Sequence, residues 1–147
     1  RLMINTGRMA VANTYTRSPA CAPGAGTSVQ NVAFQWTDGS DGCVNDLLTW
    51  SGEDLLLLVF GPQPASALDR IRQLTAQTPL KAVQVLSPGE RVQGYEHVLD
   101  PEGRLRRACQ AAGQAWALVR PDSYLAATGA DWESTLVRRL ARALALA

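Results

Sequence analysis

The stretch Leu55-Leu56-Leu57-Leu58-Val59-Phe60 decides the fold of this 147-residue sequence. Successive side chains of a β-strand point to opposite faces of its sheet, so an unbroken apolar run of this length is typical of a strand that is buried on both faces. The run is far too short to cross a bilayer as a helix. The sequence therefore predicts a central strand in a sheet that is flanked by helices.

A βαβ unit is predicted from this strand onward. The segment Gly61-Pro62-Gln63-Pro64 ends the strand, and Ser66 is predicted to cap the N-terminus of a helix. The helix carries apolar residues at helical spacing, namely Leu68, Ile71 and Leu74. Pro79 ends the helix, and Ala82-Val83-Gln84-Val85-Leu86 is predicted to form the next strand. Two strands that are joined in this way are expected to be parallel, with a right-handed crossover.

The sequence before the central strand divides into an arm and the start of a folded domain. Residues 1–31 are predicted to form an extended arm, because residues 17–27 are rich in Pro, Gly and small side chains. The folded domain is predicted to span residues 32–147. It begins with a strand at 32–36, a turn at 38–42 and a short helix at 44–50.

The C-terminal part predicts a helix, a β-hairpin and a final helix. Asp100-Pro101 is predicted to start the first of these helices and Gly113 to end it, since Asp caps exposed amides and Pro suits the first helical position. Residues 116–120 and 124–127 are predicted to pair around a turn at 121–123. The final helix is predicted to start near Asp131. Its apolar face is formed by Trp132, Leu136, Val137, Leu140 and Leu144, opposite Arg138, Arg139 and Arg142.

The order of these elements is that of the thioredoxin fold, so the predicted fold class is α/β, thioredoxin-like, with a central mixed β-sheet and an extended N-terminal arm. In thioredoxin-type redox proteins the reactive cysteine follows the first central strand, where a helix N-terminus stabilises the thiolate. Here residues 61–66 hold that position and contain no cysteine, and no proline directly precedes the strand at Trp116. We therefore expect dithiol chemistry to be absent.

Composition excludes several classes of function. The formal net charge of +1 provides no basic field for nucleic acid. The sequence shows no membrane span and no signal peptide, so we expect a cytoplasmic protein without a membrane partner. The chain starts with Arg1 and not with Met, and we expect it to begin inside a longer polypeptide.

The three cysteines are interpreted as structural or incidental. Cys21, Cys43 and Cys109 form no CxxC pair, and an odd number of cysteines argues against a disulfide framework. The same spacing argues against a zinc site. Cys109 falls on the apolar face of a predicted helix, and we expect its thiol to be inert.

Other groups that resemble site residues are also interpreted as structural. Ser66 has no base nearby, and His97 lies in a polar segment without a nucleophile motif, so His97 is predicted to be a surface or hairpin residue. The acidic residues Asp38, Asp41, Asp46, Glu53 and Asp54 do not have the spacing of a calcium loop, and turn formation explains them better. Gly24-Ala25-Gly26 follows no strand and is not a phosphate loop. The tryptophans are predicted to be core or interface residues: Trp36, Trp50, Trp116 and Trp132.

A specific motif lies in the predicted hairpin, Leu118-Val119-Arg120-Pro121-Asp122-Ser123-Tyr124-Leu125-Ala126-Ala127. Further segments precede it in a fixed order, at residues 6–10, 15–19, 54–61, 82–86 and 100–105. Together these segments resemble the C-terminal region of class A flavoprotein aromatic hydroxylases, above all enzymes like 3-(3-hydroxyphenyl)propionate hydroxylase. Phenol hydroxylases are more distant members of the same family. Ser123 stands where the family usually has Gly.

The resemblance implies a bacterial parent enzyme that binds FAD, takes hydride from NADH or NADPH and inserts one oxygen atom of O2 into a phenolic ring during aromatic degradation. The family's flavin motifs lie upstream of this region, so we assign no catalytic, cofactor-binding or metal-binding residue to this chain. The resemblance implies an accessory domain with a structural or dimerisation role, which packs on the parent's own FAD and substrate domains and performs no catalysis alone.

Two alternative functions remain open from the sequence. The first is a stand-alone thioredoxin- or peroxiredoxin-like redox protein, for which Cys43 is the candidate because it follows a Gly-rich turn at a predicted helix start. The second is a module that binds an aromatic ligand through its tryptophans. Reduction of insulin or turnover of peroxide tests the first, and tryptophan fluorescence with hydroxyphenylpropionates tests the second.

Overall fold

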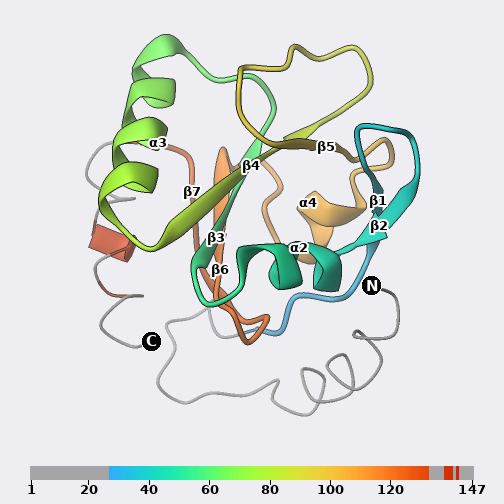
Figure 1. Ribbon diagram of the computed structural model, residues 1–147, viewed down its shortest axis with the longest axis horizontal. Helices are drawn as coiled ribbons and strands as arrows, with labels where there is room; N and C mark the ends of the chain where they lie inside the picture. Colours follow the sequence, from blue (N-terminus) through green and yellow to red (C-terminus); the bar gives the residue numbers. More distant parts are fainter. Residues whose placement is uncertain (1–26, 133–137, 141, 143–147) are drawn as a thin grey trace.

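Seven strands of the described residues form one mixed sheet (Figure 1). The computed structural model describes residues 27–132, 138–140 and 142. The strands are β1 (Ala33–Gln35), β2 (Asp41–Cys43), β3 (Leu55–Phe60), β4 (Leu80–Leu86), β5 (His97–Leu99), β6 (Trp116–Val119) and β7 (Leu125–Gly129). Across the sheet their order is β2-β1-β5-β4-β3-β6-β7. The helices are α2 (Val44–Ser51), α3 (Ala65–Gln77) and α4 (Arg104–Ala108).

The apolar run at 55–60 is the central strand β3, as predicted. Every residue of β3 is buried, with at most 4% of its surface exposed. β3 pairs in parallel with β4 on one side and antiparallel with β6 on the other, so Leu57 lies between Ala82 and Leu118. The strand–helix–strand unit from β3 through α3 to β4 and the β6–β7 hairpin are thereby confirmed.

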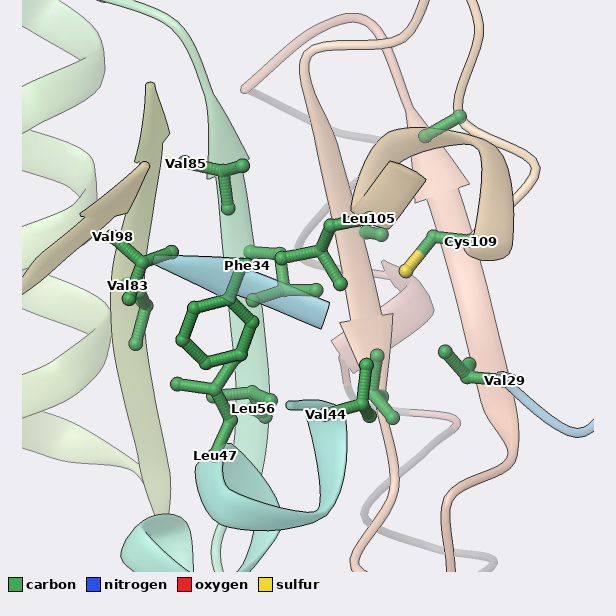
Figure 2. Close-up of a cluster of buried hydrophobic side chains, with 14 of the residues drawn as sticks. Val29, Phe34, Val44, Leu47, Leu56, Val83, Val85, Val98, Leu105 and Cys109 are labelled. Carbon is green, nitrogen blue, oxygen red and sulfur yellow. The ribbon is translucent and has the colours of Figure 1, made fainter. Parts of the chain in front are cut away.

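The alternation of side chains along β3 divides the interior into two cores. Leu56, Leu58 and Phe60 belong to the first core, which contains residues of α2, α4 and β1. Figure 2 shows part of this core, with Phe34 on β1, Leu56 on β3 and Leu105 on α4. The other residues of β3 belong to the second core, which α3 covers. The sheet is therefore flanked by helices on both faces, as the predicted fold class requires.

The structure corrects several local predictions. Residues 41–43 form strand β2, although the sequence predicted a turn over 38–42, and the turn itself occupies residues 37–39. Strand β5 was not predicted at all. Both strands have only three residues, and β2 contains just one apolar side chain, so neither shows the alternation on which strand prediction depends. His97 consequently lies in a parallel strand and not in a hairpin.

The helix boundaries also differ from the prediction. Pro64 is the residue before the first turn of α3, no side chain caps this end, and Ser66 is exposed inside the helix. α4 starts at Arg104, after Asp100-Pro101, and ends before Gly113. The N-cap residue is therefore Gly103 and not Asp100, but the Oδ2 of Asp100 still accepts hydrogen bonds from the exposed backbone N–H groups of Leu105 and Arg106 at 3.0 and 3.3 Å.

Residues 27–29 are held against the β6–β7 turn. The N–H of Val29 donates to the C=O of Ser123 at 2.8 Å, and the N–H of Leu125 donates to the C=O of Thr27 at 2.9 Å. Ser123 has a φ of 73°, a left-handed conformation that favours glycine, and its hydroxyl donates to the C=O of Val29 at 3.2 Å. This part of the chain therefore joins the domain along the hairpin.

The last part of the chain is described at Asp131, Trp132 and four later positions. Residues 138–140 and 142 are helical, Leu140 is buried, and Arg138 and Arg142 are exposed, which agrees with the predicted amphipathic helix. Leu136, Val137, Leu144, Cys21 and residues 24–26 lie outside the described residues. No helix within 27–132, 138–140 and 142 has the length and apolarity that crossing a membrane requires.

Candidate functional site

The loop after β3 occupies the place where a thioredoxin holds its reactive cysteine. Gly61 leaves the strand with a φ of 79°, a conformation that glycine adopts without strain. Its N–H donates to the C=O of Val85 at 2.9 Å, which keeps the loop on the end of the sheet. The side chain of Gln63 then folds back, and its amide nitrogen donates to the C=O of Phe60 at 2.9 Å. A hydrogen-bonding glutamine therefore lies where redox chemistry would need a thiol.

Three glutamines form one hydrogen-bonded network around this loop. The Oε1 of Gln93 accepts from the N–H of Gln63 at 2.7 Å, and the Nε2 of Gln93 donates to the C=O of Gln63 at 2.8 Å. Gln84, which is fully buried in β4, donates to the same Oε1 of Gln93 at 3.1 Å. Its own Oε1 accepts from the N–H of Gln93 at 3.1 Å. We call these three residues the amide network.

The amide network also reaches the residues that follow β7. The indole N–H of Trp132 donates to the Oε1 of Gln63 at 3.0 Å. All members of the network are neutral and none is a nucleophile, so the network has no group for proton transfer or thiol exchange. Its physical effect is to fix the loop after β3 against β4 and the segment before β5, because buried amides must find partners.

Cys109 lies in the first core and is inert. It is fully buried in the structure, with 0% of its surface exposed. Burial raises the pKa of its thiol to about 12, and the neighbouring Asp100 carboxylate contributes to the rise. The thiolate, which is the nucleophilic form, is therefore absent at neutral pH. The prediction that Cys109 is structural is in accord with this environment.

Cys43 is the N-cap residue of α2 and is half-buried. Its N–H donates to the Oδ2 of Asp46 at 3.1 Å, and its thiol lies 3.5 Å from the same oxygen. This is the reciprocal contact of a capping box, with a thiol in place of a hydroxyl. The thiol of Cys43 is thus part of the structure that starts α2.

The remaining candidate residues lie apart from each other. The Oδ1 of Asp38 accepts from the N–H and hydroxyl of Ser40 at 2.9 and 2.6 Å, which is the turn role that the sequence predicted. His97 is half-buried in β5, opposite Gln84. Within the described ranges, no three His, Cys, Asp or Glu side chains gather in a way that could hold a metal ion. The structure therefore brings no catalytic constellation together from these residues.

The tryptophans divide into core and surface residues. Trp116 is fully buried, and its ring lies 6.4 Å from that of Trp132, which is also buried. Trp50 at the end of α2 is 38% exposed, with the ammonium group of Lys81 at 5.3 Å from its ring centre. Trp116 and Trp132 thus confirm the predicted core role, and Trp50 is available to contact another molecule.

A groove of about 590 Å³ lies beside Trp50. Residues of α2, α3, the first half of β4 and the segment before β5 line it, including Trp50, Leu68, Ile71, Ala82 and Tyr95. The side-chain hydroxyl of Tyr95 is buried and has no hydrogen-bond partner among the described residues. The mixed apolar and polar lining of this groove is typical of a binding surface.

Sequence reasoning missed both the amide network and the groove. One signal for the network was present, because Gln84 interrupts an otherwise apolar strand and a buried polar side chain needs partners. Its partners Arg91 and Gln93 lie in the segment between β4 and β5, where no local pattern identifies them. The position of the groove depends on where the pairing between two strands ends. Short strands give no sequence signal for that end.

A comparison with protein families shows the family to which this chain belongs. The model of the HcaD C-terminal domain matches residues 27–143. The chain belongs to the HcaD C-terminal domain family. The resemblance of the sequence to the C-terminal region of flavoprotein aromatic hydroxylases is thereby confirmed. The match begins at the residues that pair with the β6–β7 turn. A comparison with curated proteins gives no match.

Solved structures confirm the thioredoxin-like fold of this HcaD C-terminal domain. An uncharacterised thioredoxin-like protein from Porphyromonas gingivalis is similar over 80% of this chain and 90% of its own, with 13% identity and a TM-score of 0.58. Aklavinone-11 hydroxylase, solved with FAD and aklavinone, is similar over 87% of this chain and 22% of its own, with 21% identity and a TM-score of 0.54. OxyS anhydrotetracycline hydroxylase from Streptomyces rimosus is similar over 84% of this chain and 21% of its own, with 20% identity and a TM-score of 0.51.

Proposed function

We propose that this chain is the C-terminal accessory domain of an FAD- and NAD(P)H-dependent monooxygenase that hydroxylates aromatic rings. The family match over residues 27–143 carries the proposal. Two of the similar structures are hydroxylases, and this chain covers only 22% and 21% of their lengths. Most of such a polypeptide lies outside this region, and the catalytic parts belong there. The finer features proposed for the parent are a substrate like 3-(3-hydroxyphenyl)propionate, a role in aromatic degradation and a cytoplasmic location in bacteria.

The chemistry of the loop after β3 supports an accessory and not a catalytic role. A stand-alone redox protein needs a thiolate at this loop, and the amide network fills the position with neutral side chains. Cys109 is fully buried, and Cys43 lies in the capping box of α2, away from this loop, so neither takes the place of the missing cysteine. We propose that the chain holds no FAD and performs no catalysis alone. Its role is to pack on the FAD and substrate domains of its own polypeptide and to contribute to a homodimer.

The decisive experiment measures the length and flavin content of the native gene product. Intact mass gives the length, and the visible absorbance of bound flavin gives the stoichiometry. We expect a polypeptide several times longer than this chain with one FAD per polypeptide, while the 147-residue chain purified alone is colourless. A flavin-free native product of about this length would overturn the proposal, as would stoichiometric FAD on the isolated chain.

A further inference from the structure

The first half of β4 has an open edge. β4 starts at Leu80, but β5 pairs with it only at Gln84, Val85 and Leu86. On its other side β4 pairs with β3 from Leu80 onward. Along residues 80–83, therefore, no strand of the described part of the chain lies on the β5 side. An open strand edge inside a sheet offers backbone donors and acceptors to another chain.

The backbone of Ala82 is directed to this open edge. Alternate residues of a parallel strand direct their N–H and C=O groups to opposite sides. The C=O of Val85 accepts from Gly61 on the β3 side, whereas the N–H of Gln84 donates to the C=O of Glu96 at 2.8 Å on the β5 side. Ala82 is two residues before Gln84, so its N–H and C=O also point to the β5 side. Neither group has a backbone partner among the described residues.

The groove described above runs along this edge. Trp50 of α2 lines it from the face of the first core, and Leu68 and Ile71 of α3 line it from the face of the second core. A groove that is lined from both faces of a sheet follows the edge of the sheet. Ala82 is half-buried within the groove, and Tyr95 contributes the buried hydroxyl that has no partner in the described residues.

Two independent features thus show unmet hydrogen bonds at the same place. The Ala82 backbone lacks a strand partner, and the Tyr95 hydroxyl lacks any partner within the described ranges. A buried polar group without a hydrogen-bond partner destabilises the structure, so a molecule that supplies both partners is favoured. A peptide backbone has a donor and an acceptor on every residue, in the spacing that a β-strand edge requires.

We propose that this groove binds an extended segment of polypeptide, which adds to the open edge of β4 as a strand. The segment comes from the flavin-containing part of the same polypeptide, so the inference rests on the proposed function. The hydroxylases with a similar domain contain most of their length outside it, and that length supplies such a segment. Because the edge lies between α2 and α3, one extended segment reaches it more easily than the edge strand of a second folded copy.

The lining indicates the character of the segment. Basic Arg72 and Lys81 and acidic Asp54 and Glu96 balance each other in charge. A segment with little net charge is therefore favoured over a strongly acidic or basic one. One apolar side chain of the segment packs against Leu68 and Ile71, and the exposed face of Trp50 covers the other side. Tryptophan and tyrosine are the residue types that dominate binding energy in such contacts.

Hydrogen exchange at one amide tests the proposal. The exchange rate of the Ala82 N–H is measured in the 147-residue chain and in the flavin-containing native polypeptide. We expect fast exchange in the 147-residue chain and exchange slower by about tenfold or more in the native polypeptide, since a new hydrogen bond must open before exchange occurs. Equal Ala82 exchange in a polypeptide that does contain flavin would overturn the inference and leave the proposed function intact.

A pair of variants isolates the backbone hydrogen bond. Ala82→Pro removes the N–H at the open edge without removing a hydrogen bond to β3, whereas Ala82→Gly keeps the N–H and serves as the control. In the native polypeptide we expect Ala82→Pro to speed exchange at residues 93–96 and Ala82→Gly to leave it close to the unsubstituted rate. If protection of Ala82 instead appears in the 147-residue chain on addition of 3-(3-hydroxyphenyl)propionate, the groove binds a small aromatic ligand and the peptide proposal is wrong.

Discussion

The indole N–H of Trp132 donates a hydrogen bond to the side-chain oxygen of Gln63 at 3.0 Å, and the two residues are 69 positions apart in the sequence. This bond joins the residues after the last strand to the loop after the central strand. In a redox thioredoxin that loop must stay accessible so that its thiol can react. Here an indole and two further glutamines pack around the loop, which is in accord with a structural role for the domain.

The amide network predicts a measurable stability difference between two glutamines. Gln93→Ala removes the side chain that bonds the N–H and C=O of Gln63 and the amide of Gln84. Because Gln84 is fully buried, we expect the free energy of unfolding to fall by about 1–3 kcal/mol. Urea unfolding of the 147-residue chain measures it.

Gln73→Ala is the matched control for this prediction. Gln73 is exposed on α3, and its side-chain oxygen accepts a hydrogen bond from Arg70 at 3.4 Å. Its replacement should change the free energy of unfolding by about 0.5 kcal/mol or less. If both variants lose the same stability, the amide network contributes nothing specific to the fold.

The buried thiol of Cys109 predicts a loss of stability at alkaline pH. In the folded state burial raises its pKa to about 12, whereas an unfolded cysteine has a pKa of about 8.5. Above about pH 8.5 the unfolded state therefore loses this proton while the folded state keeps it, and unfolding becomes more favourable as pH rises toward 12. When the pH is raised from about 8 to about 10, we expect the free energy of unfolding to fall by about 2 kcal/mol more in the unsubstituted chain than in the Cys109→Ala variant.

Measuring how the free energy of unfolding changes with pH in each chain cancels the packing cost of the substitution. Cys109→Ala leaves a small cavity in the first core, and this cost is the same at both pH values. The difference between the two chains therefore reports only the titration of the thiol. Parallel stability profiles for the two chains across this pH range would show that the folded thiol titrates normally.

The sequence predicted those elements whose signals are local. β3 was predicted because its apolar run is unbroken, and the β3–α3–β4 unit followed from the break at Gly61 and the helical spacing after it. The β6–β7 hairpin followed from a turn motif between two apolar segments. In each case the residues that determine the structure are neighbours in the chain.

The features that were missed depend on partners that are distant in the chain. β5 is three residues long and is a strand because β4 and β1 lie on its two sides. Gln63 and Gln93 are 30 positions apart, so no local pattern shows that they bond. Ser66 was predicted as a cap from residue type alone, but the chain enters α3 through Pro64 and the helix begins without a side-chain cap.

The contacts of Asp100 predict how strongly its carboxylate stabilises the start of α4. Its Oδ2 accepts hydrogen bonds from the N–H groups of Leu105 and Arg106, and the side chain is almost fully buried. Asp100→Ala leaves these amides without their acceptor, and we expect a loss of about 1–2 kcal/mol in the free energy of unfolding. Glu102→Ala is the control, because the exposed Glu102 side chain forms a surface ion pair with Arg104, and its backbone C=O, which accepts from Arg107, is kept in the variant. Equal losses from the two substitutions would contradict a capping role for Asp100.

The close contact between Gly129 and Trp116 predicts a steric requirement at the end of the β6–β7 hairpin that lies farthest from its turn. Trp116 lies directly opposite Gly129, and a Cβ atom at Gly129 would fall on the indole ring of Trp116. That indole cannot move freely, because its N–H donates to the C=O of Asp131 at 2.7 Å and its ring is fully buried. Gly129→Ala should therefore overpack the second core and lower the free energy of unfolding by about 1–3 kcal/mol.

A double substitution separates this steric clash from the loss of glycine itself. Phenylalanine at 116 is smaller than tryptophan and leaves room for a methyl group at 129, so Trp116→Phe combined with Gly129→Ala should cost less than the sum of the two single costs. Thr128→Ala, at the half-buried neighbouring position of β7, controls for a general effect of substitution in this strand. Additive costs would mean that the two residues do not interact sterically, and the hairpin would then select glycine at 129 for its backbone alone.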